Sequence, residues 1–284
     1  MEFAETITVI DLIHLAGLII CLAGLILFIF WLRKTSLGRK ALADSVPRRN
    51  SMPLYLPFVP LFIWFGAVSL ALSIAQELLV DLQDWQSAFV DNLILCIGAI
   101  TTTTVIILLA RAHFARRLRG FGLNMRTIIR DFFAAFVNLL TVWPLIIAAI
   151  TLTMFFGKLI WGQEYQMQQH QELELIAEHS ELPLQILIVV VAVVIGPLLE
   201  EMMFRGLVQT MIRSFFEIGN GAWLAIAASS GLFAVMHADA GHWPALFVLG
   251  VCLGYAYEKS GSLFRPIFIH SLFNATSIIA ALNQ

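Results

Sequence analysis

The sequence predicts an all-α protein, a polytopic bundle of transmembrane helices, and three observations support this. Of its 284 residues, 60% are hydrophobic and only 13% are charged, whereas soluble domains carry about 25% charged residues. The apolar residues form long runs, and a helix needs about 20 such residues to cross a bilayer. Lipid cannot hydrogen-bond to free backbone groups, so each run is helical or part of a closed barrel. These runs are too continuous for barrel strands, which leaves helices.

Eight apolar runs set the expected number of spans at about eight. In chain order they cover residues 9–32, 54–76, 92–110, 132–156, 183–204, 222–237, 244–257 and 264–282. The sixth and seventh runs are shorter than a full span. The N-terminus carries acids and no Lys or Arg before the first run, which is unlike a secretory signal peptide. We therefore expect the first run to be a retained helix.

Charge alternates between successive connections of these helices. Basic residues concentrate in the odd-numbered connections, as in Arg33, Arg39, Arg111, Arg116, Arg213 and Arg265, whereas Lys158 is the one Lys or Arg in the even-numbered connections. The positive-inside rule places the odd-numbered connections in the cytoplasm. With eight spans, both termini then lie on the non-cytoplasmic side. The expected location is an integral membrane protein, in the cytoplasmic membrane if the source is bacterial.

The unusual polar residues divide the chain into two parts. Residues 1–130 are expected to form N-terminal transmembrane helices with basic cytoplasmic loops. Residues 131–284 are expected to form a catalytic transmembrane core, because nearly all ionisable residues inside apolar runs lie there. The three cysteines lie in apolar runs without CxxC spacing, which is typical of packing residues. The expected surroundings are the lipid bilayer, and we expect no nucleic-acid partner; the sequence does not define the oligomeric state.

Two adjacent glutamates interrupt the fifth apolar run, in "VVVAVVIGPLLEEMMFRGL". Residues four apart share a helix face, so Glu201 and Arg205 can form an ion pair. Glu200 points about 100° away from Glu201 and lacks that partner. Its carboxylate must therefore face protein or a water-filled cavity. Pro197 removes one backbone hydrogen bond and is expected to kink the helix, making room for water.

Two further polar pairs lie in later runs. Phe233 and His237 are four residues apart in "FAVMH", and His270 and Asn274 are four apart in "HSLFN". Each pair on its own is compatible with hydrogen bonding between packed helices. Ionisable residues within a membrane nevertheless indicate function by default. Three such sites on three helices favour a functional site over packing alone.

The ordered motifs EExxxR, FxxxH and HxxxN resemble those of the CPBP family, also called the ABI family, which includes the type II CAAX prenyl endopeptidases. Gly206 and the run "LGVCLGYAYEKSGSLFRPIFIH" are also similar to that family, so the resemblance covers roughly residues 185–280. It implies an intramembrane endopeptidase whose substrate is a membrane-associated protein or peptide. Whether such a substrate is prenylated does not follow from the sequence.

The resemblance implies a role for each motif residue. Glu200 acts as general base on a water molecule that His237 helps to hold, while His270 and Asn274 stabilise the oxyanion. Glu201 and Arg205 support this arrangement. Alternatively, Glu200, His237 and His270 bind Zn²⁺. The HExxH zinc motif is absent from the chain, which slightly favours the metal-free mechanism and leaves both open.

Two other functions remain open at the level of sequence. One is a non-catalytic membrane scaffold or self-protection factor of the same family, against which the intact motifs argue. The other is a transporter that uses the buried Glu and His residues to relay protons or ions, against which the lack of a repeated half argues. The topology also places His237 nearer the outer side than Glu200. Catalysis therefore requires the connection after His237 to dip into the protein, where irregular backbone lines a cavity.

Overall fold

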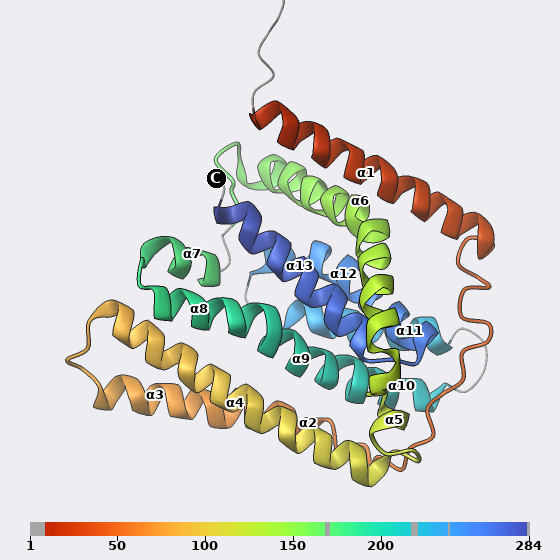
Figure 1. The fold of residues 1–284 in the computed structure, drawn as a ribbon, viewed down its shortest axis with the longest axis horizontal. Coiled ribbons are helices and arrows are strands. Elements are labelled where there is room, and N and C mark those ends of the chain that lie inside the picture. The colour runs from red at the N-terminus through yellow and green to blue at the C-terminus, as the bar shows by residue number, and fades with distance from the viewer. Residues whose placement is uncertain (1–8, 168–170, 217–220, 238, 283–284) are drawn as a thin grey trace, which may run out of the picture.

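The computed structural model describes residues 9–167, 171–216, 221–237 and 239–282, and within these ranges the chain is helical with no β-strand (Figure 1). An isolated bridge joins Asn50 to Phe114. The predicted all-α class is therefore confirmed. In chain order the elements are α1 (Val9–Lys34), α2 (Phe58–Phe62), η1 (Ile63–Ala67), α3 (Val68–Leu78), α4 (Asp84–His113), α5 (Leu118–Phe121), η2 (Met125–Thr127), α6 (Ile128–Trp161), α7 (Gln171–Glu178), α8 (Leu182–Val190), η3 (Val191–Ile195), α9 (Gly196–Glu201), η4 (Met202–Gln209), α10 (Thr210–Phe215), α11 (Gly221–Val235), η5 (Ala240–His242), α12 (Trp243–Ser260) and α13 (Phe264–Leu282).

Each of the eight predicted apolar runs coincides with a helix or with a continuous series of helical elements. Among the described residues, five such segments are long and apolar enough to cross a membrane: Leu15–Lys34, Phe58–Leu78, Asp84–His113, Met125–Trp161 and Leu182–Phe215. Helix α11 is apolar but shorter. The total of about eight spans and the sides of the two termini remain predictions.

The odd-numbered connections meet at one end of the bundle, as an alternating topology requires. Arg48 of the first connection donates to the Tyr257 carbonyl at 3.2 Å, and its guanidinium lies 3.9 Å from the centre of the Tyr257 ring. The Gly122 carbonyl of the third connection accepts from the Leu263 amide at 2.9 Å. Arg213 lies 3.2 Å from Glu258 at the end of α12. The side of the membrane that this end faces remains a prediction of the charge pattern.

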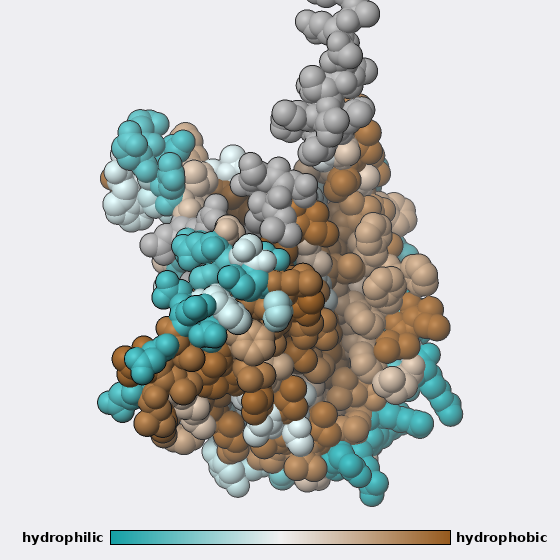
Figure 2. Space-filling model, turned by 60° about the vertical axis from the view of Figure 1, so that its left-hand side comes forward, coloured by the Kyte–Doolittle hydropathy of each residue, from teal (hydrophilic) through white to brown (hydrophobic). Residues whose placement is uncertain are grey.

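The main hydrophobic core joins the two predicted parts of the chain. Ala99 and Ile106 of α4 are buried in one cluster with Leu199, Phe233 and Tyr257. Many apolar side chains point outward instead; in α1, Ile26 is 67% exposed. Figure 2 shows hydrophobic residues over much of one face, with hydrophilic residues gathered in separate patches. This is the surface expected where lipid tails, rather than water, contact the helices.

The fifth helical segment is longer than the predicted run 183–204, because it continues to Phe215. The continuation is possible because its polar side chains bond to α12: Arg205 donates to the Gly250 carbonyl at 3.2 Å, and Gln209 donates to the Gly254 carbonyl at 3.1 Å. Glu200 therefore lies near the middle of this segment, about 27 Å along it at 1.5 Å per residue. The depth of Glu200 relative to the two membrane surfaces remains a prediction of the charge pattern.

Candidate functional site

The four predicted catalytic residues line one cavity of about 270 Å³. Glu200 comes from α9, His237 follows the end of α11, and His270 and Asn274 come from α13. His237 thus lines the same cavity as Glu200, while its catalytic role stays a prediction. Helix α13 packs against η3 and α9 (Figure 1), which brings residues about 70 positions apart in the sequence to one place.

The predicted pairing of Glu201 with Arg205 is confirmed. Arg205 Nη1 donates to Glu201 Oε1 at 2.9 Å, and both side chains are fully buried. The guanidinium also lies 4.5 Å from the centre of the Phe233 ring. Because each charge has its partner and the arginine has further contacts, this turn of the helix can lie in an apolar environment.

His270 links the two glutamates, which the spacing of the motifs did not reveal. Its Nδ1 lies 3.0 Å from Glu201 Oε1, and its Nε2 lies 3.9 Å from Glu200 Oε2. A carboxylate accepts hydrogen bonds, so the contact with Glu201 holds a hydrogen on Nδ1. The other ring nitrogen is thereby directed towards Glu200 and the cavity.

Glu200 differs from its neighbour in having no pairing of this strength. Its side chain is 31% exposed, whereas that of Glu201 is fully buried. The Oε2 atom is buried and has no hydrogen-bond partner among the described residues. A buried carboxylate oxygen without a partner is costly unless it binds something in the cavity. Glu201 Oε2 is likewise buried without a partner, but Glu200 lines the cavity and Glu201 does not. Glu200 is therefore the carboxylate available to water or to another ligand.

His237 is held in one orientation by the backbone of the preceding helix, α11. Its Nδ1 lies 2.8 Å from the Phe233 carbonyl oxygen. A carbonyl only accepts, so Nδ1 carries the hydrogen and Nε2 keeps a lone pair. The Trp243 indole donates to the His237 carbonyl at 2.9 Å, which ties the following connection back to this residue.

Phe233 lies at the centre of these side chains. Its fully buried ring makes edge contacts with the rings of His237 and His270, with centroids 4.9 and 5.6 Å apart. Its contact with Arg205 completes a group of three polar partners around one phenyl ring. The sequence identified Phe233 only as part of a motif. In the sequence, the one indication that Phe233 lies near the site is its spacing of four residues from His237.

Two π-helical segments, η3 and η4, flank the glutamate-bearing helix α9. In a π-helix each amide bonds to the carbonyl five residues earlier. Pro197 has no amide hydrogen, and the carbonyl five residues before it belongs to Ala192. That carbonyl accepts instead from Asn274 Nδ2 at 2.8 Å. A π-helical segment, η3, therefore directly precedes the helix that contains Pro197, and α13 contacts it through Asn274. The kink predicted at Pro197 remains a prediction.

The cavity wall includes residues that the sequence did not indicate. Trp64 of η1 and Leu95 and Ala99 of α4 line it, although residues 1–130 were expected to contribute helices rather than site residues. They are ordinary apolar residues in apolar runs, so no local pattern distinguishes them. Their contribution depends on how α4 packs against α9.

The predicted zinc ligands have suitable chemistry for that ion. His237 and His270 each use Nδ1 for an oxygen acceptor and leave Nε2 for another ligand, and Glu200 has an unpartnered oxygen. Zinc-binding histidines commonly donate their second nitrogen in this way. In the part of the chain that the structure describes, no group of three or more His, Cys, Asp and Glu residues is arranged to hold a metal ion.

Comparison with known proteins agrees with the motifs. Residues 182–276 match the family model described as type II CAAX prenyl endopeptidase Rce1-like. This segment is similar to that family over about a third of the chain. The matched residues include Glu200, His237, His270 and Asn274, together with both members of the buried ion pair.

Two curated bacterial relatives have related descriptions. "Putative membrane peptidase YdiL" of Bacillus subtilis is 29% identical over 96 residues, which are 34% of this chain and 38% of the relative. "Membrane-embedded CAAX protease MroQ" of Staphylococcus aureus is 33% identical over 136 residues, which are 47% of this chain and 51% of the relative. The matches thus span about half or less of these relatives. No solved structure matches the chain significantly.

Proposed function

We propose that this protein is an intramembrane endopeptidase that hydrolyses a peptide bond of a membrane-associated protein or peptide. The observation that carries the proposal is the convergence of Glu200, His237, His270 and Asn274 on one cavity, where Glu200 Oε2 is buried without a partner. The family match and the relatives described as membrane peptidases support it.

Water activation is assigned to Glu200 and His237. A water molecule donates one hydrogen to the Glu200 carboxylate and the other to the lone pair on His237 Nε2. As the water oxygen attacks the carbonyl carbon of the peptide, its proton passes to Glu200, which acts as general base. When the tetrahedral intermediate collapses and the C–N bond breaks, Glu200 returns that proton to the leaving amine.

Stabilisation of the oxyanion is assigned to His270 and Asn274. Asn274 uses one Nδ2 hydrogen on the Ala192 carbonyl and retains a second. His270 donates through Nε2 when both ring nitrogens are protonated. The site then carries two carboxylates, the Arg205 guanidinium and the His270 imidazolium, so its charges balance. An oxyanion donor is typically worth about 10²–10³ in rate.

A zinc-dependent form of the same reaction is the second candidate, because the donor types of Glu200, His237 and His270 suit that ion, although the described residues are not arranged as a metal site. When bound, zinc would supply Lewis acidity and a more acidic water. This alternative requires neutral His270, since the lone pair on Nε2 would be a ligand, whereas the oxyanion role requires a hydrogen there. A preparation freed of metal by chelation and tested with and without added Zn²⁺ separates the two.

The test of the proposal is the variant Glu200→Gln, which keeps the shape of the side chain and removes the base. Membranes from cells that produce the wild type, E200Q or the control Glu178→Gln are compared for newly formed peptide N-termini. Glu178 is exposed on α7, outside the cavity. Cleavage products that appear with the wild type and the control but not with E200Q support the proposal.

Products that persist at equal levels with E200Q would exclude Glu200 as the catalytic base. If an associated cellular effect also persists without any cleavage, a scaffold or self-protection role is favoured. Proton or ion flux through reconstituted liposomes that depends on Glu200, without proteolysis, would instead favour a transporter.

A further inference from the structure

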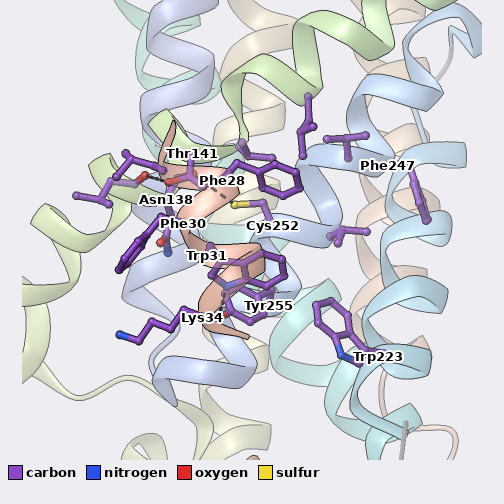
Figure 3. Close-up of a pocket in the computed structure, with 16 residues that line it drawn as sticks. Phe28, Phe30, Trp31, Lys34, Asn138, Thr141, Trp223, Phe247, Cys252 and Tyr255 are labelled. Carbon is purple, nitrogen blue, oxygen red and sulfur yellow. Dashed lines mark hydrogen bonds between the residues drawn. The ribbon is translucent and has the colours of Figure 1, made fainter. Parts of the chain in front are cut away.

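A second cavity, of about 550 Å³, lies between α1, α6, α11 and α12 (Figure 3). It shares no lining residue with the cavity that contains Glu200. Its wall is largely aliphatic and aromatic, and Figure 3 shows Phe28, Trp31, Phe247 and Trp223 around it. A volume of several hundred Å³ with an apolar wall and few polar groups is typical of small-molecule sites.

The cavity opens where two helices separate after a close contact. A Cβ atom on Gly24 of α1 would lie 2.2 Å from the Leu140 carbonyl oxygen and 2.9 Å from Pro144 Cδ, so α1 and α6 touch there. Pro144 lies inside α6, and Figure 1 shows the N-terminal half of α6 turning away from α1. The α1 residues that line the cavity, 27–34, follow Gly24. The bend in α6 therefore leaves a space that side chains do not fill.

The cavity offers several hydrogen-bond donors, and none of its lining residues is acidic. Lys34, in the basic last turn of α1, lies at its edge. The Tyr255 hydroxyl accepts from the Trp31 indole at 3.0 Å and retains its own hydrogen to donate. The Asn138 carboxamide lies in the wall and forms no hydrogen bond with another described residue. Unpaired amides are costly at membrane depth unless a ligand satisfies them.

These features fit a ligand with an apolar chain and an anionic head. The last turn of α1 belongs to the end of the bundle where the basic connections meet, which is the predicted cytoplasmic side. Anionic phospholipids of that leaflet attract Lys and Arg. Helix α1 is also poorly covered by the rest of the protein: only 6% of its apolar stretch within Leu15–Lys34 is buried. Lipid molecules therefore have direct access to the cavity.

Helix α12 separates this cavity from the proposed catalytic site. The Gly250 carbonyl accepts from Arg205 on one side of α12, while Val251 and Cys252 line the second cavity on the other. An acyl or peptide chain bound in this cavity is therefore separated from Glu200 by α12. This argues for a bound membrane lipid rather than part of a substrate.

We propose that the cavity binds one anionic phospholipid, with an acyl chain among the aromatic side chains and the phosphate at Lys34. Tyr255 donates to the phosphate, and Asn138 donates to an ester carbonyl. The proposal is independent of the proteolytic function.

The test is native mass spectrometry of the full chain in detergent, with equal amounts of dioleoyl phosphatidylglycerol and dioleoyl phosphatidylcholine added. The wild type is expected to retain one phosphatidylglycerol in preference to phosphatidylcholine. Lys34→Gln removes one cationic contact, so this preference falls about fivefold. The control Lys158→Gln changes a lysine outside the cavity and leaves the preference unchanged.

A second variant tests the acyl-chain site. Val251→Trp fills the cavity and is expected to abolish retention of both lipids, whereas Leu152→Trp, on the exposed surface of α6, retains them as the wild type does. Equal retention of the two lipids by the wild type would overturn the proposal. So would an unchanged preference in Lys34→Gln, a variant that tests the idea even if Val251→Trp fails to fold.

Discussion

The buried ion pair of Glu201 and Arg205 leads to a quantitative prediction about stability. Arg205→Met removes the guanidinium while retaining much of its apolar length. Glu201 then remains fully buried without the cation that lies 2.9 Å away, and an uncompensated charge of this kind typically costs about 3–5 kcal/mol. The Gly250 carbonyl also loses the donor at 3.2 Å, which adds about 1–3 kcal/mol. Arg205→Met should therefore destabilise the protein by roughly 4–8 kcal/mol.

A double-mutant cycle separates the charge from the other losses. Glu201→Gln removes the negative charge and keeps an oxygen that accepts from His270 Nδ1. In the double variant no unpaired charge remains, so it should be at least about 3 kcal/mol more stable than Arg205→Met alone. Reversible unfolding in mixed micelles, followed by circular dichroism, measures each free energy. Additive effects of the two substitutions would refute the argument, because they would show that the two side chains are not energetically coupled.

Two further predictions concern the residues around the glutamates. Asn274→Ala leaves the Ala192 carbonyl without its donor at 2.8 Å, so we expect the free energy of unfolding to fall by about 1–3 kcal/mol in the same assay. We also expect kcat to decrease by about 10²–10³-fold, and a variant as active as the wild type would exclude an oxyanion role. Phe233→Leu preserves most of the apolar volume but removes the ring's contacts with Phe204, His237, His270 and Arg205. We expect a loss of about 1–3 kcal/mol and a lower kcat with nearly unchanged KM, whereas unchanged stability and kcat would mean that the ring only fills space.

The local features of this protein were predictable because they depend on short spacings. Long apolar runs must be helical in lipid, and each of the eight runs does lie in helical structure. The contact between Glu201 and Arg205 follows from a spacing of four on one helix. Pro197 predicts an irregular helix for the same local reason, since it lacks an amide hydrogen.

The continuation of this helical segment beyond Arg205, to Phe215, was not predictable from the apolar run itself. A polar residue normally ends an apolar run, and the acceptors that allow the helix to continue, Gly250 and Gly254, lie about 45 residues away. The same limitation applies to Trp64 and Leu95, whose place in the cavity wall depends on packing between distant helices.

The sequence by itself determined the helical class, the residues able to do chemistry and the distinct positions of the two glutamates on their helix. Only the tertiary structure decided that His270 contacts Glu201 and faces Glu200, and that Asn274 supplies the bond that Pro197 cannot. Spacing along a helix fixes which side chains share a face. The packing of α13 against α9 fixes which faces meet, and that depends on apolar contacts spread over the whole bundle.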